Sequence, residues 1–368
     1  MSYYKEAGSF YHAQESDDFC ASAVAFSILS DQDVGFSLQG ACQSVLFQAG
    51  RSVVPLWVVD PGGMKKILNQ FKESFKGEFE ILPTTKEQDA TAQIVGQIVG
   101  GLGVAPATLI FGTQHWIAIN GVIADANPLT GSYKLLKFWI FDPFSLNPPS
   151  RKHANPDACE RIGIKEYFVF YPAGWRQMMS GFFVGGVNSY AVLGVQGVAA
   201  ANSPGTISSA SITIPINPQT HRVDAASVPQ LWQAWLGIYG SWPPGSFAEG
   251  YLPGSEVSTV TRLRRIDIPI EWYILTILKD GQFIGTGIID ASSGWPISVV
   301  VHAPGSPWRP YVERLATELV DAELIWRPCA QSMTPHLPFV ESVEVGSRIF
   351  ERIDGRRFLE LDAVFQGK

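Results

Sequence analysis

The first 172 residues carry two kinds of hydrophobic pattern, helical spacing first and strand-like runs later. Small and apolar residues recur at helical spacing in three segments and predict helices over 19–30, 36–50 and 61–75, before an amphipathic stretch over 86–101. Four runs rich in β-branched and aromatic residues follow, separated by Gly, Asn or Pro, at 107–112, 115–124, 133–143 and 165–172. We expect these runs to form an antiparallel sheet of about four strands. The pattern thus predicts an α+β domain over residues 1–175.

A segment without formal charge follows this domain. From Gln177 to His221 the chain has no Asp, Glu, Lys or Arg. The part over 178–201 is long enough to span a bilayer, but five glycines and several polar residues interrupt it. The remainder is punctuated by Ser, Pro and Gly, which is typical of a linker. We therefore expect residues 176–221 to connect two domains, with membrane association through 178–201 as the alternative.

The last part of the chain, residues 222–368, has the pattern of a β-rich domain with one or two helices. A helix is predicted over 228–239. Residues 266–301 form alternating apolar runs separated by two turn signals, Asp280-Gly281 and Ser293-Gly294, which favours a β-meander. A second amphipathic helix is predicted over 310–324, and short charged strands follow around 348–365. Core packing explains the many tryptophans of this part better than a binding platform does. Its function cannot be derived from the sequence.

Composition and charge narrow the classes of function. A chain of 368 residues is longer than one hydrophobic core usually organises, so we expect two domains. A composition of 46% apolar and 17% charged residues excludes a disordered or coiled-coil chain. A net charge of −7, without a run of Lys or Arg, argues against a nucleic acid as the main partner. The N-terminus is polar and lacks the apolar core of a secretory signal. We expect a cytoplasmic protein that acts on a protein, peptide or small molecule, with signal-independent delivery outside the cell as the alternative.

The cysteines indicate reduced thiols. There are four in the whole chain, at 20, 42, 159 and 329, which is too sparse for a disulfide framework. No CxxC or HxxxH pair suggests zinc, so we expect neither a metal nor an organic cofactor. Cys42, Cys159 and Cys329 are best explained as small buried residues. Cys20 differs from them because of the residues around it.

Cys20 opens an apolar helix, six residues after Gln14. The positive end of a helix dipole stabilises a thiolate, which is the nucleophilic form of cysteine. The Gln14 side-chain amide is placed to donate to the oxyanion that forms when a thiolate attacks a carbonyl. His115 opens a predicted strand and Asp142 ends the next strong one, so strand pairing would bring a base and its orienting carboxylate together.

In this order the residues resemble the papain-like cysteine peptidases, most of all the branch related to the bacteriocin-processing, double-glycine-leader peptidases. The resemblance covers about residues 8–172. It implies a papain-like fold, helices packed on an antiparallel sheet, with Cys20 as nucleophile and His115 as general base and acid. It also implies Asp142 as the orienting residue, and Gln14 with the Cys20 backbone N–H as the oxyanion hole. Ala21 stands where that family commonly has Gly.

Several alternatives stay open at this point. Asn147 could replace Asp142, and His12 or His153 could replace His115 as the base. Trp116 either covers the site or is an ordinary core residue, and Asp17 and Asp18 are better explained as helix caps than as catalytic acids. A catalytically inactive scaffold that binds a partner is the second hypothesis. A secreted effector that uses the same triad for deamidation or transamidation is the third.

Overall fold

The chain forms two compact units, each described here by itself. The first comprises residues 1–164, 175–206 and 364–368, and the second residues 165–174 and 207–363. The structure is a computed structural model. It describes residues 3–7, 14, 19–29, 43–53, 58–72, 77–101, 103–111, 115–144, 166–178, 182–184, 187–205, 212–240, 242, 246–304, 306 and 309–362.

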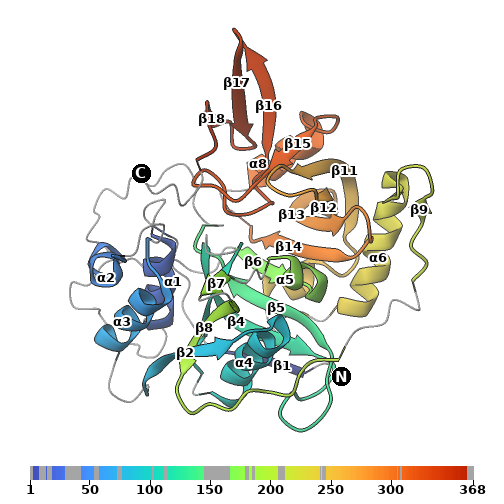
Figure 1. Cartoon of the computed structure of the whole chain (residues 1–368). Coiled ribbons are helices and arrows are strands. Elements are labelled where there is room, and N and C mark those ends of the chain that lie inside the picture. Colours follow the sequence, from blue (N-terminus) through green and yellow to red (C-terminus); the bar gives the residue numbers. More distant parts are fainter. Residues whose placement is uncertain are drawn as a thin grey trace. The chain divides into compact units, whose positions relative to one another are not determined.

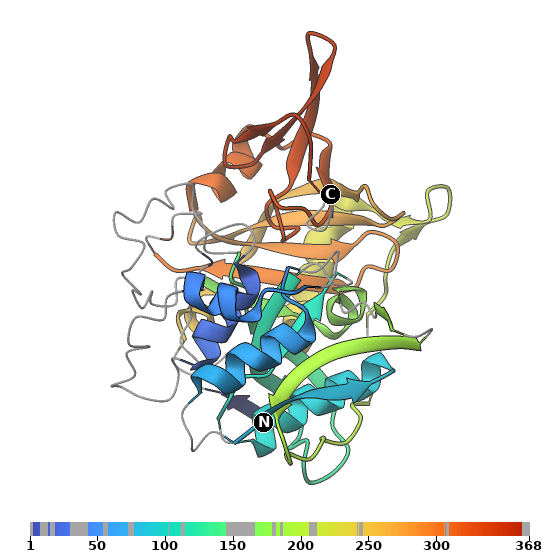
Figure 2. The same cartoon turned by 60° about the vertical axis from the view of Figure 1, so that its left-hand side comes forward.

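An antiparallel sheet forms the centre of the first unit, in the strand order β5-β4-β3-β8-β2. In addition, β1 pairs with β4 and β7 with β8. Figure 2 shows the long yellow-green β8 beside the blue β2. Every residue of β3, β4 and β5 is buried, as expected for strands covered on both faces. The strands of this sheet are β1 (Tyr3–Glu6), β2 (Phe79–Thr84), β3 (Ala107–Ile110), β4 (His115–Ala124), β5 (Leu135–Phe141), β7 (Phe182–Val184) and β8 (Val187–Val195).

The helices of the first unit are α1 (Cys20–Leu29), α2 (Gln43–Gly50), α3 (Pro61–Phe71) and α4 (Glu87–Gly100). Figure 1 shows the first three as one group in blue. Nine of the ten α1 residues are buried, because α1 packs against β4 and against α2 and α3. At the start of α3 the Asp60 side chain accepts the Gly63 N–H, and Pro61 takes a first-turn position where no amide hydrogen is needed. α4 packs against β2 and β8.

The strands of the second unit pair in the order β18-β17-β16-β15-β11-β12-β13-β14-β6. All of its pairings are antiparallel except that of β11 with β15. The turn from β12 to β13 is Asp280-Gly281, both with positive φ, which is the geometry of a two-residue hairpin. The strands are β6 (Glu166–Phe170), β11 (Glu256–Arg265), β12 (Glu271–Lys279), β13 (Gln282–Asp290), β14 (Pro296–His302), β15 (Leu324–Trp326), β16 (Phe339–Glu344), β17 (Ser347–Arg352) and β18 (Arg357–Phe358).

Three helices and several short elements complete the second unit. The α6 helix buries Trp232, Trp235 and Tyr239, and the Trp235 ring stacks on that of Tyr239. The helices are α6 (Val228–Tyr239), α7 (Phe247–Tyr251) and α8 (Arg309–Thr317), and the short elements are β9 (Ile216–Asn217), β10 (Arg222–Val223) and the 3-10 helix η2 (Ala225–Ser227). The helix α5 (Pro172–Met178) is divided, with residues 172–174 in the second unit and residues 175–178 in the first.

The α+β class is therefore as expected, and the domain organisation differs from the expectation in two places. The run over 165–172 forms a strand as predicted, β6, but it belongs to the second unit, where it pairs with β14. Residues 176–221, expected to connect two domains, instead contribute β7 and β8 to the first unit's sheet. Their lack of charge fits a strand that pairs on both edges, with β3 and β2. Among the described residues, no helix is long and apolar enough to cross a membrane.

Candidate active site

The structure places Cys20 at the first position of α1, where the sequence expectation put it. The Ala23 N–H donates to the Phe19 carbonyl oxygen at 2.9 Å, so the helical hydrogen bonds start in this turn. Cys20 is a free cysteine of intermediate exposure, whereas α1 from Ala21 onward is buried. The thiol is thus the accessible end of an otherwise buried helix, and it lies where the helix dipole favours a negative charge.

His115, the first residue of β4, is fully buried. Its Nε2 lies 2.8 Å from Asp142 Oδ1. Nδ1 has no hydrogen-bond partner among the described residues, and Cys20 lies close enough to raise the pKa of the imidazole. The carboxylate therefore holds Nε2, and Nδ1 is the ring nitrogen that can exchange a proton with another group.

Asp142 directly follows β5 and is only 1% exposed. Its Oδ1 accepts the Phe144 backbone N–H at 2.9 Å in addition to its contact with His115. This local turn, formed where Pro143 ends the strand, holds the carboxylate in one orientation. Asp142 can therefore fix which imidazole nitrogen carries the proton.

Gln14 lies next to this turn. It is 2% exposed, and its backbone N–H donates to the Pro143 carbonyl oxygen at 3.0 Å. The hydrogen bond ties the segment that precedes Cys20 to the residue that follows Asp142. Gln14 thus lies beside the turn that holds Asp142, and Cys20 lies close enough to His115 to affect its pKa.

The electrostatics of His115 follow from these contacts. Burial lowers the pKa of the imidazole, but the nearby Asp142 carboxylate and Cys20 raise it by more than burial lowers it. The resulting pKa is about 9. An ordinary histidine has a pKa near 6.5 and is mostly neutral at pH 7. His115 is therefore protonated at neutral pH and can stabilise a thiolate beside it.

The structure describes two of the alternative candidates, Trp116 and Cys329. Trp116 is buried, and its indole N–H donates to the Val59 carbonyl oxygen at 2.9 Å, which makes it an anchored core residue. Cys329 is buried in the second unit, and burial raises its pKa to about 11, so it is a poor nucleophile. The other candidates lie outside the described residues: His12, Asp17, Asp18, Cys42, Asn147, His153 and Cys159.

Two contributions to the site were not predicted from the sequence, the Phe144 N–H that binds Asp142 and the Val59 carbonyl that binds Trp116. The first had a signal, because an Asp followed by Pro commonly accepts a backbone N–H two residues later. The second had none, because a backbone carbonyl on a distant segment leaves no mark in the sequence.

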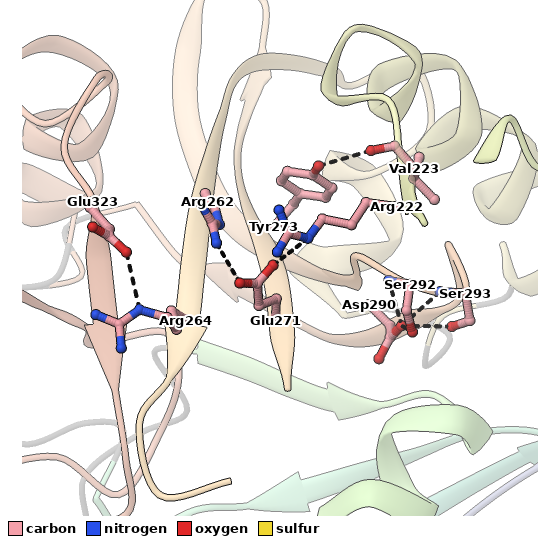
Figure 3. Close-up of polar contacts among 10 residues, drawn as sticks. All are labelled: Arg222, Val223, Arg262, Arg264, Glu271, Tyr273, Asp290, Ser292, Ser293 and Glu323. Atoms are coloured by element: carbon pink, nitrogen blue, oxygen red, sulfur yellow. Dashed lines mark hydrogen bonds and ion pairs between the residues drawn. The ribbon is translucent and has the colours of Figure 1, made fainter. Parts of the chain in front are cut away.

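Polar clusters of the second unit have a structural explanation. Figure 3 shows Glu271 between Arg262 and Arg222, and Arg264 beside Glu323. Such half-exposed pairs contribute little stability, and here each arginine is matched by a carboxylate. Asp290 accepts hydrogen bonds from the backbone and hydroxyls of the two serines that follow it in a turn (Figure 3). In the part of the chain that the structure describes, no group of three His, Cys, Asp or Glu residues could hold a metal ion.

Comparison of the chain with protein-family models, with curated proteins and with solved structures found no match. The interpretation of the site therefore depends on its own geometry.

Proposed function

We propose that the chain is a papain-like cysteine peptidase that hydrolyses a peptide or isopeptide bond of a protein or peptide substrate. The observation that carries the proposal is the buried His115, held by Asp142 on Nε2 and close enough to Cys20 for the cysteine to raise its pKa. A buried imidazole with a raised pKa, beside an accessible thiol at a helix start, has few purely structural explanations.

The chemistry follows from this arrangement. The Cys20 thiolate attacks the carbonyl carbon and forms a tetrahedral intermediate, whose oxygen would accept hydrogen bonds from the Cys20 backbone N–H and the Gln14 amide. His115 gives its proton to the leaving nitrogen as the carbon–nitrogen bond breaks, which leaves a thioester. Water then attacks the thioester and passes a proton to His115, and the thiolate is restored with release of the acid. No cofactor takes part in these steps, and the required reduced thiol fits a cytoplasmic location.

The experiment is a digestion of a proteome-derived peptide mixture, with the new termini read by mass spectrometry. Wild-type protein should create termini that are absent with Cys20→Ser, while Cys329→Ser, which alters a buried thiol remote in sequence, should retain them. Conversion of glutamine side chains to glutamate, or joining of amines to glutamine, would replace hydrolysis of the main chain by deamidation or transamidation. Identical products from wild type and Cys20→Ser would contradict the proposal and favour a non-catalytic scaffold.

A further inference from the structure

Trp116 immediately follows His115 in β4 and has a specific polar contact. Its side chain is 3% exposed, and the indole Nε1–H donates to the Val59 carbonyl oxygen at 2.9 Å. A buried tryptophan needs a partner for this N–H. The partner here belongs to the segment that leads into α3, and not to the sheet in which Trp116 lies.

The Val59 carbonyl is a firm anchor because both of its neighbours are held. The Ser52 N–H donates to the Val58 carbonyl oxygen at 3.0 Å. Asp60 caps α3 by accepting the Gly63 N–H at 2.8 Å and the Ser52 hydroxyl at 2.5 Å. The α3 helix in turn packs against α1, the helix that begins with Cys20. The indole hydrogen bond therefore links the strand of His115 to the helices that carry the nucleophile.

Consecutive side chains on a strand leave the backbone in opposite directions. The His115 imidazole is held by Asp142, and the next side chain, Trp116, is held by Val59. Rotation of this part of β4 about its own axis would break one of the two hydrogen bonds. Two opposed restraints on neighbouring residues thus fix the direction in which the imidazole points.

We propose that Trp116 is a positioning residue, whose hydrogen bond to Val59 fixes the rotation of β4 and so aims His115 at Cys20. This inference rests on the proposed function. It goes beyond it by assigning a role to a residue that need not touch the substrate. Small misplacements of reacting groups reduce rates strongly, so the loss of this one donor should be visible in the chemistry of the thiol.

The test compares two tryptophans of the first unit that make the same kind of contact. Trp116→Phe removes the indole donor to Val59, and Trp175→Phe removes the Trp175 indole donor to the Thr91 hydroxyl, a buried bond of 2.8 Å. Thr91 lies in α4, away from the segment that leads into α3. Benzothienylalanine at position 116 is the second variant, because it keeps the shape of the indole and lacks only the N–H donor.

The readout is the rate of iodoacetate alkylation of Cys20 at about pH 6, where an ordinary thiol is protonated. We expect both changes at position 116 to lower this rate by roughly 10- to 100-fold. With a substrate found as above, they should lower kcat with little change in KM. Trp175→Phe should leave both quantities at the wild-type value, although it loses a comparable buried hydrogen bond. Alkylation rates at position 116 equal to that of Trp175→Phe would overturn the positioning role.

The His115→Ala variant separates the two proposals. If it slows alkylation of Cys20 and the changes at Trp116 do not, only the positioning role fails. If it leaves alkylation unchanged, His115 does not activate the thiol, and both the proposed function and this inference fail.

Discussion

At the scale of single residues, the protonation state of His115 decides what the site can do. A buried imidazole without partners would lose its proton, but Asp142 and Cys20 outweigh the effect of burial and bring the pKa to about 9. Because the group is protonated at neutral pH, it can supply the proton that a leaving amine needs.

Asp142→Asn should lower the pKa of His115, since the carboxylate raises it both by its charge and by its hydrogen bond. The alkaline limb of kcat/KM, set by loss of the His115 proton, should then move from about pH 9 to lower pH. NMR titration of the imidazole measures the same shift without a substrate. Asp125→Asn is the control, because Asp125 accepts a backbone N–H at an exposed turn. An unchanged titration of His115 in Asp142→Asn would contradict this account of its charge.

Val345 offers a residue-scale test of backbone strain. Val345 and Gly346 form the two-residue turn between β16 and β17. The φ angle of Val345 is 49°, and its side chain is fully exposed. A β-branched residue is costly in this left-handed region, which Asn tolerates. Val345→Asn should therefore raise the free energy of unfolding by about 1 kcal/mol in urea denaturation. Val343→Asn, in the strand of the same hairpin, should give no gain; equal effects at both positions would argue against strain.

The four site residues could be proposed from the sequence because each had a local signal. Cys20 starts an apolar run and Gln14 lies six residues before it. His115 starts a strand, and Asp142 precedes a proline at a strand end. What the sequence could not provide was the contact between them. The tie between the Gln14 backbone and Pro143, for example, joins segments more than a hundred residues apart through main-chain atoms.

Among the helices and strands, long periodic segments were predicted well, but the unit to which β6 and β8 belong was not. The bounds of β4 and α6 coincide with the predicted 115–124 and 228–239. By contrast, β2 was missed because it is short and its segment contains Pro83, β6 was expected in the first domain, and β8 was expected to be part of a connecting segment. A hydrophobic period reports whether a strand is buried, but it does not say which neighbour buries it.

The crossing of α2 and α3 depends on two glycines. A Cβ atom on Gly63 would lie 2.1 Å from the Gly50 carbonyl oxygen, so the helices meet backbone to backbone. Gly63→Ala should lower the free energy of unfolding by about 1 to 3 kcal/mol, because one helix must move. The control is Gly100→Ala at the end of α4, where the nearest atom would be 3.7 Å away. Equal stability of the two variants in urea would show that the crossing is not close-packed.

At the scale of whole units, the second unit contains a buried pair of histidines. His336 binds the Thr286 hydroxyl through Nδ1 at 2.7 Å and the Ser298 hydroxyl through Nε2 at 2.8 Å. Burial, and next the charge of Arg309, lower the pKa of His302 to about 3; burial and His302 lower that of His336. Glu166 is opposite His302 in the pairing of β6 with β14. Both imidazoles are therefore neutral in the folded unit at ordinary pH.

This pair should make the second unit sensitive to acid. In the unfolded chain each histidine gains a proton below about pH 6.5, whereas in the folded unit His302 gains one only near pH 3. Stability is thus complete above about pH 6.5 and falls as the pH decreases, by about 1.4 kcal/mol per pH unit for each histidine. Urea unfolding from pH 7 to 5 measures the slope. His336→Gln should reduce it and His221→Asn, at an exposed position, should not; a slope that His336→Gln leaves unchanged would contradict the assignment.

If His115 converts Cys20 into a reactive thiolate, the rate of Cys20 alkylation measured against pH should show it. Iodoacetamide labelling of each cysteine would be followed by mass spectrometry in wild type and in His115→Ala. We expect Cys20 alone to react rapidly well below about pH 8, and we expect this reactivity to disappear in the variant. Equal and slow labelling of all the cysteines, or labelling of Cys20 only on unfolding, would contradict the account and leave the site without its nucleophile.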